Sequence, residues 1–596
     1  MNREELPQSP QLVDDAHGKQ LTGANVRGPA QPLGSRAYAL PVELLAYVFL
    51  LGYDHGFDPH RPFKRRELEP DSNWEVVVSH VCSHWRSVAL DTPQLWTDIR
   101  LRKLNHLERG AEFVKRSRKA PLDILVDTVS PEEYDEAEPG SLLGIKEFDT
   151  AFKVAIDHTE RWRSLIVKVC DLPCKGRARA NLRDCPPIPK LETLQLWHVQ
   201  QWEDTNNMLN ATVIPPIPIL NDYVPSLLNA SLVGVNLAYD KTSYLKGLRQ
   251  LELALHSHNC RPTSAEFEGI LRDCPELERL SLHYSGPQVD QTHEGGQVRL
   301  ERLRELSLVN MDLEVLQHVV RRVAMPNLLS LELDLPEMPD AGGLDFTPVV
   351  DYLAMATAPA FPSLEHLSVN ALACSKESWT SWLPTLPHLK TLELDFSEGR
   401  LPHGFFDPLC APAESVPMPS APAPAPAGSP PPLSPGSGSP PRSVSPSSPA
   451  GMSSMNPSPV LPNVPTPQAL LPNLEELKTK GLESSHLIRF AAFRRSADVC
   501  VPKFLVHIKS VDPDTDALEA SHEVKYFGLE DVVDEEEEEE YSEEEGEDEG
   551  GQAGGEDEDA EYSDDDAGHA PADSQSGSPV VVMDSAIYKL GPPLRL

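Results

Sequence analysis

Aromatic residues, basic residues and strongly apolar segments are all scarce in this chain of 596 residues. Phe, Trp and Tyr make up only 6% of it, so part of the chain lacks the apolar surface needed to offset the entropy of folding. It has 52 Lys and Arg against 92 Asp and Glu, a net charge of −40. This charge disfavours nonspecific binding to DNA or RNA, because phosphate neutralisation supplies most of that affinity. A partner with a basic surface is more plausible.

Segments for membrane insertion or secretion are also missing. The most apolar run, residues 40–53, contains Pro41 and Glu43 and is shorter than the ~20 residues that span a bilayer. The N-terminus is acidic and has no apolar core typical of a secretory signal. The nine cysteines are diluted over a long chain and odd in number, unlike a disulfide framework. We therefore expect reduced thiols and a soluble protein of the cytoplasm, the nucleus or both.

Motifs typical of enzymes and metal sites are absent as well. The 20 histidines include no HExxH, and neither a GxxxxGK[ST] phosphate loop nor a GxGxxG helix start occurs. Cys170, Cys174 and Cys185 suggest a zinc site, but the first two have three intervening residues and no fourth ligand follows at a finger-like spacing. We predict no catalytic, cofactor-binding or metal-binding residue, although pattern alone does not exclude a catalytic cysteine.

Composition divides the chain into folded and unfolded parts. Residues 411–470 hold 19 of the 59 prolines, among Ser, Ala and Gly, and show no apolar periodicity to bury. Residues 534–566 hold 21 Asp and Glu and no Lys or Arg, so this block repels itself and stays solvated. The predicted division is a disordered segment at 1–37, a helical domain at 38–100, a repeat domain at 101–400, a disordered insert at 401–470, a last repeat with a C-terminal cap at 471–530, and a disordered acidic tail at 531–596.

A Pro-x-Leu-x-x-Leu-x-Leu pattern recurs seven times between residues 189 and 394. The copies are PKLETLQL, GLRQLEL, PELERLSL, RLRELSL, PNLLSLEL, PSLEHLSV and PHLKTLEL. Their first leucines are 25 to 36 residues apart, except for one step of 57 that contains a degenerate copy, SLLNASLVGV. The regular steps match the period of leucine-rich repeats, ~20 to 29 residues. The pattern resumes weakly at residues 472–481, after the proline-rich insert.

Each copy predicts a short strand, and helical patterns lie between the strands. Leu-x-Leu alternation places the leucines on one face of a strand and the intervening residues on the other. One helical pattern covers residues 263–274, with Thr263 and Glu266 at capping-box spacing, and others cover 313–323 and 349–355. Because a single strand and helix cannot bury their apolar faces alone, we expect the units to stack into an α/β solenoid with parallel strands on its concave side.

Upstream of the repeats, apolar residues at helical spacing predict two short amphipathic helices, followed by a turn at PQLW. The first contains Leu44, Leu45, Val48 and Phe49, and the second contains Val78, Val81, Cys82, Trp85 and Ala89. The segments LPVELL and VCSHWRSVALDTPQLW resemble the F-box, with its Leu-Pro-x-Glu-Leu opening and its Val-Cys-x-x-Trp-Arg to Leu-Trp close. An insertion at residues 52–72 separates the two halves, an arrangement that resembles the F-box-like proteins of mushroom-forming fungi. On the pattern alone, a plain helical cap for the repeats is the alternative.

The resemblance implies a substrate-recognition subunit of an SCF-type cullin-RING ubiquitin ligase. The F-box would bind the Skp-type adaptor of the cullin complex and the repeats would bind a target protein. The chain would be non-catalytic and would contribute proximity and orientation. The matching positions, which serve adaptor binding, the small core of the module, or both, are Leu40, Pro41, Leu44, Leu45, Val48, Val78, Val81, Cys82, Trp85, Leu95 and Trp96.

Target contacts are expected at the residues that flank the strand leucines. These are Gln195, Trp197, Glu252, Ser281, His283, Ser307, Glu332, Asp334, Ser368, Asn370, Glu393 and Asp395. Several are acidic, so a target with a basic patch is the hypothesis, and the alternative is that they are ordinary solvated strand residues. Two other functional classes stay open: an F-box protein that works outside a ligase, and a non-catalytic scaffold or acidic chaperone that binds basic proteins. We expect neither nucleic acid nor a membrane as a partner.

Overall fold

The computed structural model describes two compact units of the chain, one containing the described residues up to Leu95 and the other those from Trp96 onward. The described residues are 40–53, 73–128, 143–169, 172–198, 216–220, 223–290, 292–293, 295–335, 345–354, 360–397, 401–411 and 469–528. The segment at 1–37, most of the proline-rich insert and the acidic tail lie outside them. Within these ranges no helix has both the length and the apolar composition that crossing a bilayer requires.

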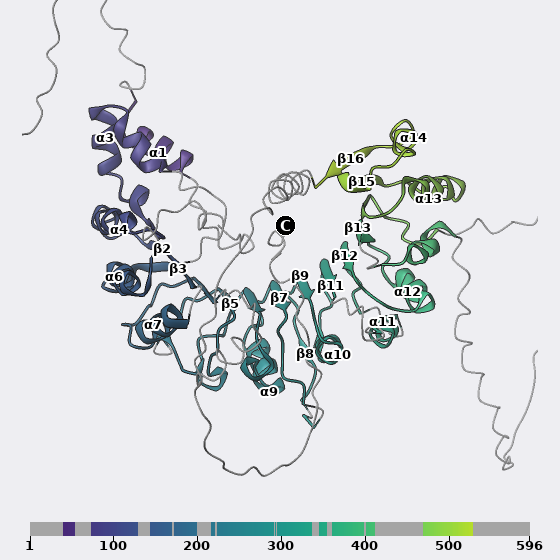
Figure 1. Ribbon diagram of the computed structural model, residues 1–596, viewed down its shortest axis with the longest axis horizontal. Helices are drawn as coiled ribbons and strands as arrows, with labels where there is room; N and C mark the ends of the chain where they lie inside the picture. Colours follow the sequence, from purple (N-terminus) through teal and green to yellow (C-terminus); the bar gives the residue numbers. More distant parts are fainter. Residues whose placement is uncertain are drawn as a thin grey trace, which may run out of the picture. The chain divides into compact units, whose positions relative to one another are not determined.

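The first unit consists of three short helices, α1 (Val42–Gly52), α2 (Trp74–His80) and α3 (Ser83–Leu90) (Figure 1). Phe49 lies at its centre and is fully buried. The ring of Trp85 packs against Phe49 with centroids 5.0 Å apart, and the indole N–H of Trp74 donates to the Phe49 carbonyl at 2.8 Å. The two halves of the F-box-like pattern therefore share one small core.

The second apolar pattern of this unit was expected to form one helix, and that prediction is wrong. Residue Cys82 adopts an extended conformation, with φ −163°, between α2 and α3. Its sulfur accepts a hydrogen bond from the backbone N–H of Trp85 at 3.4 Å and so caps α3. The apolar spacing from Val78 to Ala89 therefore does not reveal that the helix is interrupted at Cys82. A residue that caps a helix can also occupy an apolar position of the helical pattern.

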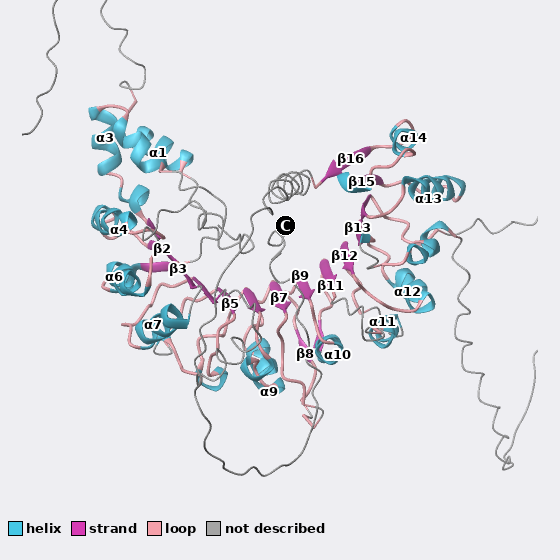
Figure 2. Cartoon of the chain, in the orientation of Figure 1, coloured by secondary structure: helices cyan, strands magenta, loops and turns pink. Residues whose placement is uncertain are grey.

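The second unit is an α/β structure built on a long parallel sheet. Among the described residues the sheet has fourteen strands, and their order in space follows their order in the chain. Figure 2 shows the strands along one side of this unit and the helices along the other. The strands are β1 (Asp98–Leu101), β2 (Leu122–Asp127), β3 (Trp162–Val169), β4 (Thr193–His198), β5 (Asn229–Val233), β6 (Gln250–Ala254), β7 (Arg279–His283), β9 (Glu305–Val309), β11 (Ser330–Asp334), β12 (His366–Asn370), β13 (Thr391–Asp395), β14 (Glu476–Lys480), β15 (Lys503–His507) and β16 (Val524–Phe527).

Helices connect most of these strands. They are α4 (Asn105–Arg116), α6 (Ile145–Ile156), α7 (Leu172–Arg183), α9 (Ser264–Arg272), α10 (Leu313–Arg322), α11 (Thr347–Ala354), α12 (Lys376–Trp382), α13 (Ser484–Ser496) and α14 (Thr515–Glu519). The predicted capping box of α9 is confirmed, since Thr263 and Glu266 each accept a hydrogen bond from the other's backbone N–H. A further parallel pair, β8 (Val298–Arg299) and β10 (Val323–Ala324), lies outside the long sheet.

The repeat leucines form two rows beneath the sheet, because consecutive strands pair in register. In the first row Leu251 pairs with Leu280 and Leu280 with Leu306. The row continues through Leu331, Leu367, Leu392 and Leu477. Each of these seven side chains is at most 2% exposed, and burial of one leucine contributes about 2 kcal/mol. In the second row Thr479 stands where most earlier strands have leucine, and it is also buried. The row continues on β15 with buried Val506. This arrangement is compatible with the predicted repeat solenoid.

The sheet begins earlier than the repeat pattern indicates. Strands β1, β2 and β3 precede the first copy of the pattern, and β1 pairs with β2 from Asp98 onward.

Trp96, predicted as part of the F-box-like module, belongs to the second unit. Its ring packs edge-on against Phe113 at 5.0 Å, and the Arg116 guanidinium lies 4.5 Å from its centroid. The boundary between the units is therefore at residues 95–96 rather than at 100.

The predicted insert also begins too early. Residues 401–411 form two 3-10 turns, η9 (His403–Phe405) and η10 (Asp407–Cys410). Phe405 is 3% exposed and stacks on Trp379 with centroids 4.0 Å apart, while Phe406 contacts Phe490 at 5.5 Å. Apolar contacts on both sides thus hold these eleven residues in the fold, although their sequence has no repeat pattern.

We expect the substitution Phe405→Ala to destabilise the second unit by about 3 kcal/mol, because it removes a buried ring and leaves a cavity beside Trp379. The matched control is His403→Ala, an exposed ring of the same turn, with an expected loss below about 1 kcal/mol. Urea unfolding and hydrogen exchange of α12 measure the stability of both variants. Equal stability of the two variants would contradict the assignment of residues 401–411 to the core.

Candidate functional site

Helix α1 exposes one apolar face while it buries another. Leu45 and Phe49 are at most 1% exposed and form the buried face. On the adjoining side of the helix, Leu44 is 52% exposed, Val48 46% and Leu51 67%. These three residues are four and three positions apart, so they share one face of the helix. A soluble helix ordinarily turns polar residues outward, and an exposed apolar face of this kind marks an interaction site.

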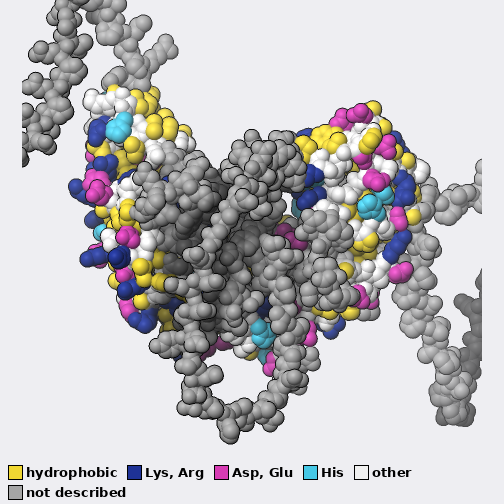
Figure 3. Space-filling view, viewed as in Figure 1, with side chains coloured by type: hydrophobic (Ala, Val, Ile, Leu, Met, Phe, Trp, Pro, Cys, Tyr) yellow, Lys and Arg dark blue, Asp and Glu magenta, His cyan; other side chains and the backbone are white. Residues whose placement is uncertain are grey.

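The first unit has further exposed hydrophobic residues. Figure 3 shows hydrophobic side chains gathered over the α1–α3 region. We call the set the apolar surface of the first unit; its members, each at least 38% exposed, are Leu40, Val42, Leu44, Tyr47, Val48, Leu51, Val77 and Val81. Four of them, Val42, Tyr47, Leu51 and Val77, were not predicted. The sequence could have predicted Leu51, since it continues the helical spacing of Leu44 and Val48.

The predicted adaptor-binding residues separate into two groups. Leu40, Pro41, Leu44, Val48 and Val81 are exposed, so their side chains are available to a partner. By contrast, Leu45, Val78, Leu95 and Trp96 are buried, and Cys82 and Trp85 are intermediate. Because Cys82 caps α3 and Trp85 packs on Phe49, both of these residues maintain the fold of the unit.

The strand residues between the leucines lie on the other face of the sheet, but not all of them are accessible. Of the predicted target-binding set, Gln195, Trp197 and Ser307 are buried, each at most 7% exposed. Trp197 donates its indole N–H to Ser231 at 3.0 Å, and Ser231 donates to Glu252 at 2.5 Å. The residues with partial exposure are Glu252, Ser281, His283, Glu332, Asp334, Ser368, Asn370, Glu393 and Asp395.

Acidic residues on β11 and β13 form the charged part of this face. Glu393 and Asp395 are register partners of Lys478 and Lys480 on β14, at 2.5 Å and 3.6 Å. The two lysines were not predicted, although their Lys-x-Lys spacing places them on that face. Cross-strand pairing therefore already neutralises the acids of β13, and basic side chains border them.

Glu332 on β11 has a different environment. Its carboxylate accepts a hydrogen bond from Ser307 at 2.7 Å, and no ion pair joins it to a cation among the described residues. Burial raises the pKa of Glu332 and the bond from Ser307 lowers it. The charges of Asp334 and Glu393 raise the pKa further, while the charge of Lys478 acts in the opposite direction. A cationic group placed here would relieve that repulsion.

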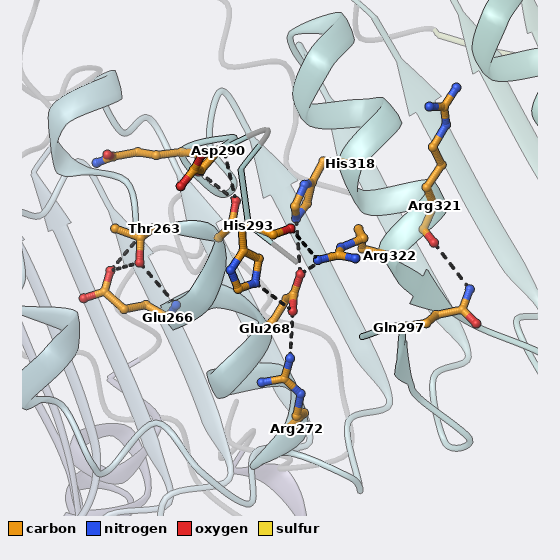
Figure 4. Close-up of polar contacts among 12 residues, drawn as sticks. Thr263, Glu266, Glu268, Arg272, Asp290, His293, Gln297, His318, Arg321 and Arg322 are labelled. Carbon is orange, nitrogen blue, oxygen red and sulfur yellow. Dashed lines mark hydrogen bonds and ion pairs between the residues drawn. The ribbon is translucent and has the colours of Figure 1, made fainter. Parts of the chain in front are cut away.

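A second polar cluster lies among the helices, around Glu268 of α9. Its carboxylate is fully buried and accepts bonds from Arg272 at 2.7 Å, Arg322 at 3.1 Å and His293 at 3.2 Å. Figure 4 shows these groups and His318 converging on the one carboxylate. Burial alone would raise the pKa of Glu268, but the bond from His293 and the charge of Arg322 outweigh it and lower the pKa. The cluster joins α9, α10 and the segment before β8, so its role is structural.

The cysteines form no metal site in the described part of the chain. No group of three or more His, Cys, Asp or Glu side chains is positioned there to hold a metal ion. Cys174 and Cys185 are both fully buried, and burial raises the pKa of Cys185 to about 11, which disfavours the thiolate that binds metals. Cys170 lies outside the described residues.

Comparison with protein-family models and with curated proteins found no match for this chain.

We expect the substitution Glu268→Gln to destabilise the second unit by roughly 1 to 3 kcal/mol, because it breaks a buried charge cluster. Since the fold lowers the pKa of Glu268, its contribution is present at neutral pH and is lost as the pH falls below the ordinary value of 4.5. Urea unfolding at several pH values measures this. The control is Glu314→Gln, an exposed carboxylate of α10, with no expected effect; a pH profile unchanged by Glu268→Gln would disprove the assignment.

Proposed function

We propose that this protein is the substrate-recognition subunit of an SCF-type ubiquitin ligase, in which the first unit binds a Skp-type adaptor and the sheet unit binds a target protein. The observation that carries the proposal is the apolar surface of the first unit. Leu40, Pro41 and Leu44, which carry the Leu-Pro-x-Glu-Leu resemblance to the F-box, all belong to the exposed part of that unit. The chain supplies no catalytic group in this role.

The energetics favour a stable protein partner for this surface. Each of its side chains keeps 38% to 67% of its area in contact with water. Transfer of such area to an interface contributes about 25 cal/mol per Å², and a few large apolar residues at the centre of an interface dominate its affinity. An adaptor helix packed along α1 would cover Leu44, Val48 and Leu51 together, since these share one face.

The direct test is the double substitution Leu44→Ser and Val48→Ser. Because both side chains are exposed, folding should be unaffected, while affinity for a Skp-type adaptor should fall roughly 100-fold. Isothermal titration measures the affinity, and circular dichroism with thermal unfolding checks the fold. A variant of Trp85 is unsuitable here, since Trp85 packs on Phe49 and its loss would unfold the unit.

The matched control is Tyr223→Ser with Val511→Ser. These two residues are 56% and 50% exposed and belong to the second unit. The control should bind the adaptor as the wild type does. Wild-type protein that fails to bind the adaptor at micromolar concentration, or a Leu44/Val48 variant that binds as well as the control, would overturn the proposal.

For the target, the sheet face favours a segment that carries a basic side chain opposite Glu332 and Asp334. Burial is the main cause of the raised pKa of Glu332, and the charges of Asp334 and Glu393 add to it. Asp334 accepts a hydrogen bond from the Asn370 amide at 2.8 Å. Lys478 and Lys480 limit the acidic region on the β14 side, so the preferred target segment would place acidic or neutral residues there.

Charge reversal tests this preference. Glu332→Lys with Asp334→Lys should reduce target recovery at least tenfold when full-length protein is purified from its source cells and quantified by mass spectrometry, while adaptor recovery stays constant. The control is Glu314→Lys with Glu377→Lys, two exposed carboxylates on α10 and α12. Target recovery that is the same for both double variants would contradict a role for the acidic strand residues.

The same purification separates the alternative function, an acidic scaffold or chaperone of basic proteins. The motivating feature of that alternative is the acidic tail, which lies outside the described residues. Basic proteins such as histones recovered without any Skp-type adaptor would favour the alternative. Recovery of the adaptor and a cullin with the wild type, and their loss with Leu44→Ser and Val48→Ser, would favour the ligase subunit.

A further inference from the structure

A small pocket lies between helix α7 and the ends of strands β3 and β4 in the second unit. Its volume is about 40 Å³, room for roughly three water molecules. Most of its lining is apolar and includes Val167, Val169, Leu182 and Leu237. Lys175, Arg179 and His198 also line it, so cationic and imidazole groups are present in an otherwise apolar cavity.

Lys175 is the unusual group of this pocket. It is only 4% exposed, although lysines are almost never fully buried without an ionic partner. Its ammonium lies 3.0 Å from Nδ1 of His198 and donates to the carbonyl of Gly234 at 3.0 Å. No carboxylate lies within ion-pair distance of Lys175 among the described residues.

The protonation of His198 follows from that geometry. An ammonium group can only donate hydrogen bonds, so Nδ1 of His198 must accept and the imidazole proton is on Nε2. Burial, followed by the charge of Lys175, lowers the pKa of His198 to about 3. His198 is therefore neutral and supplies no counter-charge to Lys175.

Lys175, which lines the pocket, thus retains one hydrogen-bond donor. Two of its three N–H groups have acceptors, Nδ1 of His198 and the carbonyl of Gly234. A buried cation without an anion costs several kcal/mol, whereas a methionine of similar length would fill the same space at no such cost. An anion in the pocket would remove that penalty and accept the third hydrogen bond.

We propose that this pocket binds a small monocarboxylate, with the carboxylate on the Lys175 ammonium and a short alkyl body against the valine and leucine side chains. The volume admits a ligand of acetate to propionate size. The apolar lining disfavours inorganic phosphate, whose oxygens would all need polar partners. This site is independent of the apolar surface of the first unit and of the proposed ligase function.

The pH dependence of binding provides a specific signature. Burial, followed by the charge of Arg179, lowers the pKa of Lys175 to about 8, while Cys260 acts in the opposite direction. A bound carboxylate favours the ammonium, so binding is strongest below pH 8 and weakens about tenfold per pH unit above it. The titratable and charged groups nearest Lys175 are His198, Arg179, Cys260 and His256. Burial lowers the pKa of both histidines to about 3, so both are neutral across this range.

The test uses propionate and the full-length protein in saturation-transfer NMR. We expect saturable binding with a Kd on the order of 1 mM, as is reasonable for a ligand of so few atoms. The variant Lys175→Met should bind at least tenfold more weakly while its unfolding temperature is equal to or above that of the wild type. The control Arg177→Met removes an exposed charge of the same helix and should leave binding unchanged.

Two further ligands and a pH series complete the experiment. Propionamide, which has the same shape without the charge, should not bind, and inorganic phosphate should not displace propionate. The proposal is overturned if propionate does not saturate below about 20 mM, if Lys175→Met binds it equally well, or if the affinity is constant from pH 7 to pH 9. Phosphate that binds in a Lys175-dependent way while propionate does not would likewise overturn the carboxylate assignment.

Discussion

In-register stacking of the strand leucines is the constraint on which the second unit depends. A single repeat, one strand of five residues with a short helix, cannot bury its own apolar face. Each repeat therefore needs a neighbouring repeat on both sides. The register supplies this, because Leu251, Leu280 and Leu306 occupy the same position on adjacent strands. A shift of one residue would turn these leucines to the opposite face. Neighbouring strands of the long sheet therefore occur in the same order as in the chain.

The same register determines the chemistry of the opposite face. The register brings each side chain between the leucines beside the side chain at the same position on the next strand. Charged side chains of adjacent strands therefore attract or repel one another. Glu393 and Asp395 consequently meet Lys478 and Lys480, although 85 residues separate Glu393 from Lys478 in the chain. Glu332 meets only serines at its position, Ser307 and Ser368, and its acidity is weakened by burial.

The small size of the first unit limits how much apolar surface it can bury. Three short helices enclose a core around Phe49, Leu45 and Val78, and a domain so small leaves much apolar surface uncovered. In this unit the uncovered surface is concentrated on α1, where Leu44 and Leu51 are more than half exposed. A partner helix would complete the core, which is why the apolar surface, rather than any polar group, supports the proposed adaptor binding.

The sequence by itself determined the repeats, the capping box of α9 and the division of strand residues between two faces, because these features depend on local periodicity. The break at Cys82, the assignment of Trp96 to the sheet unit and the incorporation of residues 401–411 were decided only in the tertiary structure, since each depends on the atoms that pack against it. The same holds for the target-binding set, of which Gln195, Trp197 and Ser307 are buried. Lys175 is the clearest case: its partners His198 and Gly234 are 23 and 59 residues away, and no local pattern indicates that its ammonium is buried.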